Sequence, residues 1–511
     1  MYLGKNFAAF LVCYLCSIGF ASAEVLDVAG DDEAYDWFGT DVAVGDFNGD
    51  GFDDLAIGVP GQDSQTGAVN ILYGGNGRRR KLGTSGQQYI TESAVSATAA
   101  PYNYFGTALA VGNFNGDQYD DLAVGVPYKN VGSTKTSAGT VIVIHGSSSG
   151  LNISTAKEWS QDTNGIIDDA ESYDYFGRSL AAGDFDHDGN DDLAVGVPNE
   201  DTLAGSNTGA INIIFGTSAN GLDAARNQFI ARAVGIARGG ELFGSALTTG
   251  DYDNDGHDEL AVGIPYYSNL QYVFPGTVLV FRGLAGGLEA TGTEWHQDID
   301  GVAGERDHSE YFGRSLSSGD TDGDGYEDLV IGVPGDTGAL SSRGYVGALN
   351  VLRGSSSGLS VLNNKIVYQA QDERNAPTTV YENMGSSVTA GDFNGDGRSD
   401  VATGLPYETV NTKFYAGAVQ IFYGQNTGIE EYGNQLFHQD TSGVEDEVDI
   451  GDRFGQSVAS GDFNRDGYDD LVVGVPFEAT AGNTVTNAGV VHVFYGTSSA
   501  LQTRNNQLIM Q

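Results

Sequence analysis

One segment recurs seven times along the chain and dominates what the chain can fold into. Its first copy runs from Asp46 to Pro60 and reads DFNGDGFDDLAIGVP. The later copies start at Asn113, Asp184, Asp251, Asp320, Asp392 and Asp462. Successive copies lie 67 to 72 residues apart, so seven periods occupy nearly all of the 511 residues. A regular period of this size indicates seven equal structural units and leaves no room for a second domain.

Each period contains four short apolar runs. In the first period, Thr40–Gly45 follow the pair Phe38-Gly39, Leu55–Val59 follow the Asp-rich segment, and Gly67–Tyr73 form the third run. The fourth run carries a large apolar residue, such as Trp159 or Trp295. The runs are too short for helices, are rich in β-branched and aromatic residues, and are separated by Gly, Pro and Asn. Four strands per period predict one blade per period.

The second run of each period is apolar at successive positions, as in Leu193–Val197. This pattern is typical of a strand that is buried on both faces, as when blades stack around an axis. We therefore predict an all-β fold, a seven-bladed β-propeller of four-stranded antiparallel blades over residues 24–511. A β-helix or another solenoid would have a shorter period.

Two segments compete for the strand that closes the ring. Asn505–Met510 resembles the starts of the fourth runs at Asn227 and Asn434, whereas Val25–Val28 lies at the other end of the chain. The sequence leaves open which of the two completes the seventh blade.

The first 23 residues have the features of a signal peptide. Lys5 is followed by the apolar run Phe7–Phe20 and by the small-residue cleavage site Ala21-Ser22-Ala23. We predict that residues 1–23 are removed and that the protein is secreted to the extracellular space, or to the periplasm in a Gram-negative bacterium. Both cysteines, Cys13 and Cys16, lie in this segment, so the mature chain is expected to fold without disulfides. No later run approaches the length of a membrane-spanning helix.

Acidic residues greatly outnumber basic ones in this chain. It has 69 Asp and Glu against 24 Lys and Arg, a formal net charge of −45. So negative a protein is expected to bind neither nucleic acid nor anionic membranes. The charge also opposes a compact fold through self-repulsion, unless cations neutralise part of it.

The Asp-rich segment has the spacing of a cation-binding loop. In the first copy, oxygen-bearing side chains stand at positions one, three, five and nine, which are Asp46, Asn48, Asp50 and Asp54. The residue at position seven, Phe52, would add its backbone carbonyl, and the glycine at position six permits the sharp turn. The pattern resembles an EF-hand loop, but position twelve is not Glu, so Asp at position nine has to replace it. Hard oxygen donors in a supple loop favour Ca²⁺ over Mg²⁺ or Zn²⁺.

Six of the seven loops carry the predicted metal ligands. These are Asp46, Asn48, Asp50, Phe52 and Asp54; Asp184, Asp186, Asp188, Asn190 and Asp192; Asp251, Asp253, Asp255, His257 and Glu259; Asp320, Asp322, Asp324, Tyr326 and Asp328; Asp392, Asn394, Asp396, Arg398 and Asp400; and Asp462, Asn464, Asp466, Tyr468 and Asp470. The loop at Asn113 has Gln118 in place of the glycine and is predicted to be weak or empty. We expect about six Ca²⁺ sites, each stabilising the fold by roughly 1.4 kcal/mol at an extracellular-type affinity.

The Phe-Gly openings, the Asp loops and the Gly-Val-Pro strand ends together resemble the FG-GAP repeat family, whose best-known members are the propeller heads of integrin α subunits. The resemblance covers residues 24–511. It implies that the Asp loops bind Ca²⁺ on one face and that the opposite face meets ligands. The sequence shows no leg-like domain, no inserted adhesion domain and no membrane helix, so we expect a free-standing, monomeric propeller.

Aromatic residues gather on the face that is predicted to lie opposite the Asp loops. They stand just before a Phe-Gly pair or just after the Pro of Gly-Val-Pro: Trp37, Tyr104, Tyr175 and Tyr311, and Tyr128, Tyr266 and Tyr407. In integrin heads, aromatics at matching positions accept a basic side chain of the partner. A ring of aromatics rimmed by acids suits cation–π capture of Lys or Arg. The same rings would also suit stacking on sugars, or simply packing of the central channel.

No catalytic constellation is visible in the sequence, and we expect no enzymatic activity. The segments Gly146–Gly150 and Gly354–Gly358 match G-x-S-x-G, but both fall at turns between the third and fourth strands with no following helix. The predicted function is an extracellular recognition or cell-adhesion module that binds a protein or a glycan. The alternative is a Ca²⁺-dependent polysaccharide-binding protein, lyase or hydrolase that uses the same face.

Overall fold

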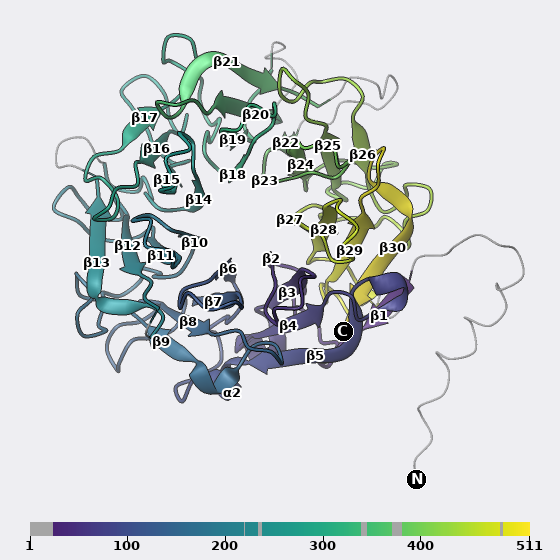
Figure 1. Cartoon of the computed structure of the whole chain (residues 1–511), viewed down its shortest axis with the longest axis horizontal. Helices are drawn as coiled ribbons and strands as arrows, with labels where there is room; N and C mark the ends of the chain where they lie inside the picture. Colours follow the sequence, from purple (N-terminus) through teal and green to yellow (C-terminus); the bar gives the residue numbers. More distant parts are fainter. Residues whose placement is uncertain (1–23, 219, 233–237, 339–344, 370–380, 481–483) are drawn as a thin grey trace, which may run out of the picture.

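Seven small sheets stand around a central axis in the protein (Figure 1). The computed structural model describes residues 24–218, 220–232, 238–338, 345–369, 381–480 and 484–511. Within each sheet, four strands that follow one another in sequence pair in antiparallel order from the axis outward. The predicted seven-bladed propeller is confirmed. The predicted signal peptide, residues 1–23, lies outside the described residues.

The blades have closely similar strand lengths. Blade 1 holds β2 (Val42–Gly45), β3 (Asp54–Val59), β4 (Ala68–Tyr73) and β5 (Gly83–Thr91); blade 2 holds β6 (Ala108–Gly112), β7 (Asp121–Val126), β8 (Thr140–Ile144) and β9 (Lys157–Trp159); blade 3 holds β10 (Leu180–Gly183), β11 (Asp192–Val197), β12 (Ala210–Phe215) and β13 (Asp223–Ala231); blade 4 holds β14 (Ala246–Gly250), β15 (Glu259–Gly263), β16 (Val278–Phe281) and β17 (Thr293–Trp295). Blade 5 holds β18 (Leu316–Gly319), β19 (Asp328–Val333), β20 (Tyr345–Arg353) and β21 (Ser360–Val367); blade 6 holds β23 (Ser387–Gly391), β24 (Asp400–Leu405), β25 (Ala418–Phe422) and β26 (Gln435–Phe437); blade 7 holds β27 (Ser457–Gly461), β28 (Asp470–Val475), β29 (Val490–Tyr495) and β30 (Gln502–Met510).

Helical turns within the described residues are short and only connect strands. They are α1 (Gln62–Gln65), η2 (Arg78–Arg80), α2 (Glu92–Val95) and η3 (Ile153–Thr155). None of the described helices is long and apolar enough to cross a membrane.

The second strand of each blade is buried along its whole length. All six residues of β11 are buried, and the same holds for β3, β7, β19, β24 and β28. The reason is that a neighbouring blade covers each face, so apolar clusters form between blades rather than inside one. In one such cluster, Val69 and Ile71 of blade 1 pack with Phe105 and Val124 of blade 2. The continuous apolar runs in the sequence are thereby explained.

The Phe-Gly and Gly-Val-Pro glycines hold adjacent blades at close backbone contact. A Cβ on Gly125 would lie 2.2 Å from the carbonyl oxygen of Gly177, and one on Gly196 would lie 2.3 Å from that of Gly244. Phe176, beside Gly177, is completely buried. Because no side chain fits at these contacts, blade stacking requires glycine at both motif positions.

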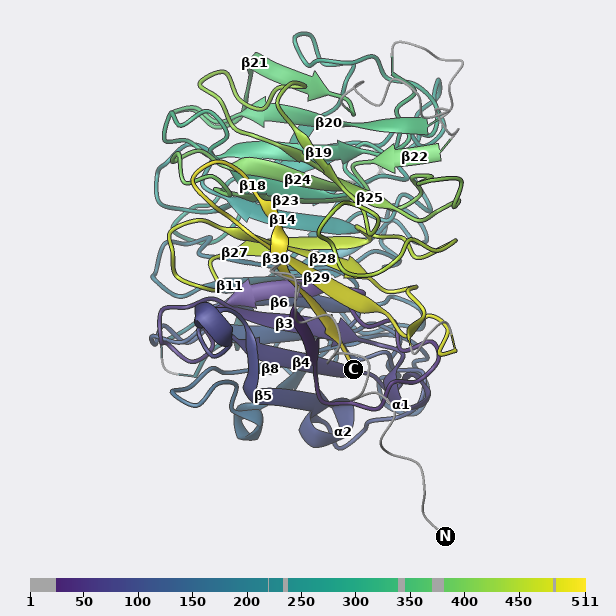
Figure 2. The same ribbon diagram turned by 90° about the vertical axis from the view of Figure 1, so that its right-hand side faces the viewer.

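Both ends of the chain complete the seventh blade. Strand β30 takes the fourth position, antiparallel to β29. Strand β1 (Glu24–Asp27) then pairs in parallel outside β30, with Glu24 opposite Gln507 and Asp27 opposite Met510. Figure 2 shows β30, in yellow, on the outer side of the ring. The two segments that competed in the sequence therefore occupy two adjacent positions of one five-stranded sheet.

A second parallel addition lies in blade 5, where β22 (Tyr381–Met384) pairs with the start of β20. Similar single bridges join Gly67 to Phe105 and Gly209 to Phe243. In each case the chain that enters the next blade is tied to the third strand of the blade before it.

Candidate functional site

The Asp loops join the first and second strands of each blade and all lie at one end of the ring. In blade 1, the position-one carboxylate of Asp46 organises the loop by accepting the backbone N–H groups of Asp50 (3.0 Å) and Gly51 (2.8 Å). Asp50 in turn accepts the N–H of Phe52 at 3.0 Å. Gly51 has φ +80°, a conformation that favours glycine. Hydrogen bonds from backbone N–H groups to the carboxylates of the loop therefore fix its conformation.

The carboxyl group at position nine is the most deeply placed group of the loop. Asp54 is 0% exposed, and it accepts the N–H groups of Phe47 (3.0 Å) and Gly74 (2.9 Å). Burial raises the pKa of Asp54 to about 8, and it does the same for Asp192 and Asp400 in blades 3 and 6. A buried carboxyl beside two other carboxyls needs a cation if it is to be ionised at neutral pH. This donor set fits Ca²⁺, which prefers carboxylate oxygens.

Carboxylate oxygens converge in three of the loops. One oxygen from each residue lies within 4.8 Å of the others in the sets Asp184, Asp186 and Asp192; Asp251, Asp253 and Asp255; and Asp320, Asp322 and Asp328. Buried oxygens of Asp186, Asp253 and Glu259 have no hydrogen-bond partner. In the loops of blades 1, 6 and 7, position three is Asn, and its amide faces the position-nine carboxylate at 3.2 to 3.5 Å. The structure thus brings positions one, three and nine together in blades 3 and 5, and positions one, three and five together in blade 4.

The position-seven residues are placed by their backbone. The N–H groups of Phe52, Asn190, His257, Tyr326, Arg398 and Tyr468 each donate to the position-five carboxylate, at 3.0 to 3.2 Å.

Arginine side chains enter three of the loops, which the sequence analysis did not foresee. Arg353 is 5% exposed and directs Nη1 to Asp322 (3.2 Å) and to Asp328. Arg282 contacts Asp253 at 2.7 Å, and Arg226 pairs with Asp186; both of these arginines are exposed. Arg282 and Arg353 stand directly before the glycine at the end of the third strand, a position that is tyrosine in blades 1, 6 and 7. The exchange of tyrosine for arginine is visible in the sequence, but its consequence for the loop becomes clear only when the strand register is known.

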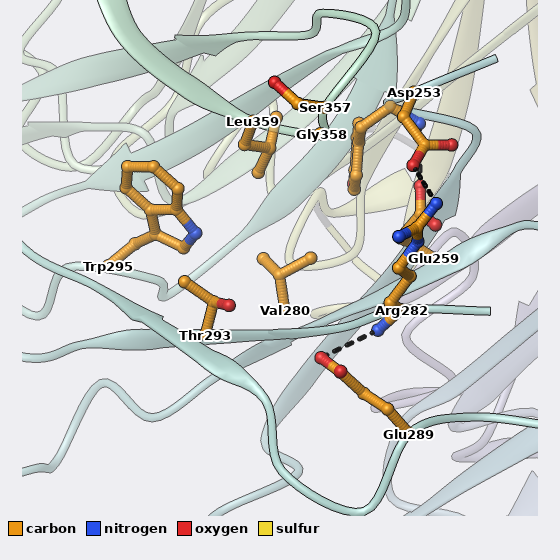
Figure 3. Close-up of a pocket in the computed structure, with 11 residues that line it drawn as sticks. Asp253, Glu259, Val280, Arg282, Glu289, Thr293, Trp295, Ser357, Gly358 and Leu359 are labelled. Atoms are coloured by element: carbon orange, nitrogen blue, oxygen red, sulfur yellow. Dashed lines mark hydrogen bonds and ion pairs between the residues drawn. The ribbon is translucent and has the colours of Figure 1, made fainter. Parts of the chain in front are cut away.

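The arginine of blade 4 lines a pocket of about 250 Å³ between blades 4 and 5 (Figure 3). Arg282 stands between Asp253 on one side and Glu289 on the other, and it donates its backbone N–H to Glu289 at 3.2 Å. Trp295, Val280 and Leu359 form the apolar wall. The pocket therefore opens beside the fourth Asp loop.

The loop of blade 2 is held together without converging carboxylates. The amide of Asn113 donates to the carbonyl oxygen of Asp117 at 2.8 Å. His145 Nδ1 lies 2.8 Å from Asp121 and 3.3 Å from the amide of Asn115. These amide and imidazole contacts take the places that cation ligands would need.

The acid at position eight, present in six of the seven loops, ties adjacent blades together, a role that the sequence analysis missed. Asp120 accepts the backbone N–H of Asp46 in the preceding blade at 2.8 Å, and Asp191 accepts that of Asn113 at 2.7 Å. The seam between blades 7 and 1 repeats this, with Asp53 accepting the N–H of Asp462 at 2.7 Å. The two adjacent acids therefore have different partners. The acid at position nine accepts hydrogen bonds within its own blade, and the acid at position eight accepts one from the loop of the preceding blade.

The predicted aromatic residues lie on the opposite face, and four of them form a continuous row. Ring centroids are 6.1 Å apart for Trp37 and Tyr104, 5.1 Å for Tyr104 and Tyr128, and 5.2 Å for Tyr128 and Tyr175. All four are half-buried. The row runs across blades 1 to 3, so side chains from separate repeats make one surface.

The other predicted aromatics form two smaller groups. Tyr266 and Tyr311 lie 5.8 Å apart, and Phe274, which the sequence analysis did not include, contacts both. Tyr407 contacts Tyr415 at 5.8 Å.

The residue before each Phe-Gly pair has a left-handed backbone. Its φ is +56° at Trp37, +57° at Tyr104, +60° at Tyr175 and +57° at Tyr311. The equivalent Leu242, Asn383 and Arg453 share this conformation. Large side chains rarely adopt it, because it costs of order 1 kcal/mol or more. Because this conformation recurs at all seven equivalent positions, we infer that it sets the direction of the side chain before each Phe-Gly pair or its Met-Gly equivalent.

One of the residues before a Phe-Gly pair is itself a cation that contacts aromatic rings of this face. Arg453 replaces the aromatic residue of blade 7, and its guanidinium lies 5.1 Å from the Tyr407 ring centroid and 4.4 Å from that of Phe477. Phe477 follows Pro476 and is the blade-7 equivalent of Tyr128. Between the aromatic groups, a cavity of about 620 Å³ opens on the axis, and Tyr128, Tyr175 and Tyr266 lie on its wall.

The two G-x-S-x-G segments are turns. The hydroxyls of Ser147 and Ser355 donate to the carbonyl oxygens of Gly150 and Gly358, both at 2.7 Å. They connect the third and fourth strands of blades 2 and 5, as the repeat pattern predicts.

The fold and its two faces define a repeat propeller of the integrin-head type, and comparison with known proteins gives the family. The model of the FG-GAP repeat matches residues 38–72, 105–144, 176–213, 243–281, 312–349, 384–422 and 454–494, which together are more than half of the chain. The chain belongs to the FG-GAP repeat family.

Relatives of known function share only parts of their length with this chain. Integrin alpha-5 of Xenopus laevis is 28% identical over 262 residues, which are 50% of this chain and 22% of the integrin. Integrin alpha-V of Gallus gallus is 31% identical over 45% of this chain and 20% of its own length. The phosphatidylinositol-glycan-specific phospholipase D of Bos taurus is 24% identical over 78% of this chain and 46% of the enzyme. The chain thus spans about a fifth to a half of these relatives.

Among solved structures, the Dos1 propeller aligns over 93% of this chain and 84% of its own, at 11% identity and a TM-score of 0.42. This TM-score is too low to relate the two chains by fold or function.

Proposed function

We propose that the protein is an extracellular recognition module that binds a basic side chain of a partner protein on its aromatic face. The observation that carries the proposal is the aromatic row from Trp37 to Tyr175, three of whose four residues have a left-handed backbone and two of which, Tyr128 and Tyr175, line the axial cavity. Its rings are half-buried rather than sealed in the core, so their faces are available to a ligand.

The chemistry of the face favours a cation. Arg453 already lies against Tyr407 and Phe477, so equivalent positions of this ring bind a guanidinium within the chain itself. Exposed acids such as Asp63, Asp168 and Asp201 stand on the loops of the same face. They would draw a basic partner toward a protein whose net charge is −45.

We propose a structural role for Ca²⁺ in the Asp loops. The support is the convergence of carboxylates in blades 3, 4 and 5 and the raised pKa values of the buried position-nine acids. Loops 1, 6 and 7, which none of the three arginines described above enters, are the strongest candidates, and Asp54, Asp400 and Asp470 would be the deepest ligand of each. In loops 3, 4 and 5, Ca²⁺ would have to displace Arg226, Arg282 or Arg353. The loop at Asn113 is proposed to bind none.

Secretion, the absence of catalysis and a monomeric state belong to the same proposal. The support for secretion is the signal-like pattern of residues 1–23. Integrin α subunits and the phospholipase D are larger than the part that this chain matches, so neither integrin pairing nor lipid-anchor cleavage is carried over.

The proposal is tested with arrays that present defined ligands. The calcium-loaded protein is applied to peptides with one Arg or Lys in an uncharged sequence, and in parallel to a glycan array. We expect binding to the basic peptides, weakened at least tenfold by Tyr128→Ala or Tyr175→Ala. Tyr432→Ala is the matched control, since Tyr432 is 88% exposed and lies on the Asp-loop face. Saccharide binding that is abolished by Tyr175→Ala or Tyr311→Ala would overturn the protein-binding proposal in favour of the polysaccharide alternative.

A further inference from the structure

Between adjacent blades, on the aromatic face, three repeat positions meet in a small buried polar site. The first is the second residue beyond the large apolar residue of the fourth strand, such as Gln161 beyond Trp159. The second is the residue two before the next Phe-Gly, such as Asp174, and the third is the residue two after the next Gly-Val-Pro, such as Glu200. These sites lie at the other end of the strands from the Asp loops.

The site between blades 2 and 3 contains carboxylates with no cationic partner. Gln161, Asp174 and Glu200 are 1%, 2% and 1% exposed. One carboxylate oxygen from each of Glu171, Asp174 and Glu200 lies within 4.8 Å of the others. Among the described residues, no Lys or Arg forms an ion pair with Asp174 or Glu200. Burial raises the pKa of Glu200 to about 8, because a site that excludes water disfavours a negative charge without a cationic partner.

The glutamine of this site has an oxygen without a partner. Gln161 Nε2 donates to Glu200 at 2.6 Å, and the amide head therefore lies among the carboxylates. Its Oε1 is buried and makes no hydrogen bond. A buried amide oxygen without a donor is unfavourable, because it loses the hydrogen bonds that water would give it. A rotation of the amide by half a turn would direct this oxygen to the same place as the carboxylate oxygens.

The site between blades 6 and 7 has the equivalent glutamine and pair of acids. Gln439, Asp452 and Glu478 are all buried, and Gln439 Nε2 donates to Glu478 at 2.6 Å. The Oε1 of Gln439 again has no partner. The two sites are built from equivalent residues of different repeats, so the orphaned oxygen recurs with the acid pair.

At two other seams the chain places its own cation at an equivalent position. Between blades 1 and 2, Lys129 replaces the acid after Gly-Val-Pro, and its Nζ lies 2.9 Å from both Glu92 and Glu158. Between blades 3 and 4, Arg232 replaces the glutamine and lies 2.7 Å from Glu241. The seam sites therefore need positive charge, and the chain supplies it at some seams but not at others.

We propose that the sites at Gln161, Asp174 and Glu200 and at Gln439, Asp452 and Glu478 each bind a Ca²⁺ ion. Two carboxylates neutralise a divalent cation, the glutamine oxygen adds a third hard donor, and Glu171 at the first site adds a fourth. No Cys or His enters either set, which argues against Zn²⁺. Such ions would lie under the aromatic face and would join neighbouring blades, separately from any ion in the Asp loops.

The test measures the calcium bound by variants that place a lysine in the site, as the chain itself does with Lys129. Each protein is dialysed against ~1 mM Ca²⁺, at the weak end of the range for extracellular sites, and its calcium is measured by mass spectrometry. Glu200→Lys copies Lys129, and Glu478→Lys does the same at the second site. We expect each variant to lose about one Ca²⁺ per chain and the double variant about two, with the fold retained because the lysine replaces the ion.

Two further proteins make the count decisive. Asp201→Lys introduces the same charge change at an exposed neighbour of Glu200 and should leave the count unchanged. Glu200→Gln is nearly isosteric and replaces Glu200→Lys if the latter fails to fold. A calcium content equal to that of the unmodified protein in the folded Glu200 and Glu478 variants would overturn the proposal, because the carboxyls would then be held by protons instead.

Discussion

Replacing Arg353 with tyrosine is expected to convert the fifth Asp loop into a tighter Ca²⁺ site. Blades 1, 6 and 7 carry Tyr73, Tyr423 and Tyr495 at this position, and their hydroxyls donate to a glutamine on the fourth strand, away from the loop. In blade 5 the guanidinium instead contacts Asp322 and Asp328, two of the predicted ligands. A cation entering this loop must first displace Arg353.

The size of the effect follows from the contacts that must be broken. A unit-charge pair about 4 Å apart is worth about 4 kcal/mol at an effective dielectric constant of 20. Hydration of the released guanidinium offsets much of this, which leaves about 1.5–3 kcal/mol, the range of charge-assisted hydrogen bonds. At about 1.4 kcal/mol per factor of ten, Arg353→Tyr should tighten Ca²⁺ binding at this loop by roughly 10- to 100-fold.

The assay is calorimetric titration of the decalcified protein with Ca²⁺. Arg353→Tyr should add one site to the tight class, and the reciprocal Tyr73→Arg should remove one from it. Arg504→Tyr is the matched control, because Arg504 is exposed on β30 and, among the described residues, forms no ion pair with a loop carboxylate. If Arg353→Tyr leaves both the number and the affinity of the tight sites unchanged, the guanidinium does not compete with Ca²⁺ and the reasoning is wrong.

Three further outcomes are expected from thermal unfolding. Removal of Ca²⁺ by a chelator should lower the melting temperature by about 4 °C if loops 1, 6 and 7 are filled, at roughly 1.4 kcal/mol each; an unchanged melting temperature would refute the structural role of the loops. In the chelated protein, burial raises the pKa of Asp54, Asp192 and Asp400 to about 8, so the stability that these groups contribute should be greatest below about pH 4 and should be lost as the pH rises toward 8, whereas saturating Ca²⁺ should flatten this profile. Gly125→Ala should destabilise the fold by about 1–3 kcal/mol through the contact with the next blade, whereas Gly286→Ala, where the added Cβ meets nothing within 4 Å, should be neutral.

The repeat architecture was readable from the sequence because each blade uses the same local rules. Seven registered periods, short β-branched runs and glycines at fixed positions predict blade number, strand order and the face of every loop. The aromatic row was also predictable, since strand alternation alone places Trp37, Tyr104, Tyr128 and Tyr175 at one end of the ring. These features depend on position within one repeat, which the sequence states directly.

Features that join different repeats were not predictable in the same way. The parallel addition of β1 to β30 brings together residues 483 positions apart, such as Glu24 and Gln507. The entry of Arg353 into a loop requires the register of β20 against its neighbours and the length of the side chain. The buried site at Gln161 combines three segments of two blades. No local pattern marks such a group until the blades are placed side by side.

The seven repeats also show that equivalent positions need not keep the same residue as long as the local charge is balanced. At the seams, Lys129 and Arg232 provide the positive charge in two places, while Gln161 and Gln439 stand beside unpaired acids in two others. At the Asp loops, Arg353 stands where Tyr73 stands in blade 1. In a chain with a net charge of −45, a buried carboxylate that lacks both backbone donors and a cation is unfavourable, and we propose that the repeats obtain the missing cation either from their own side chains or from solution. The distribution of Lys and Arg among equivalent positions therefore predicts where the protein depends on metal ions: least where it carries its own cation, and most where glutamine or tyrosine takes that place.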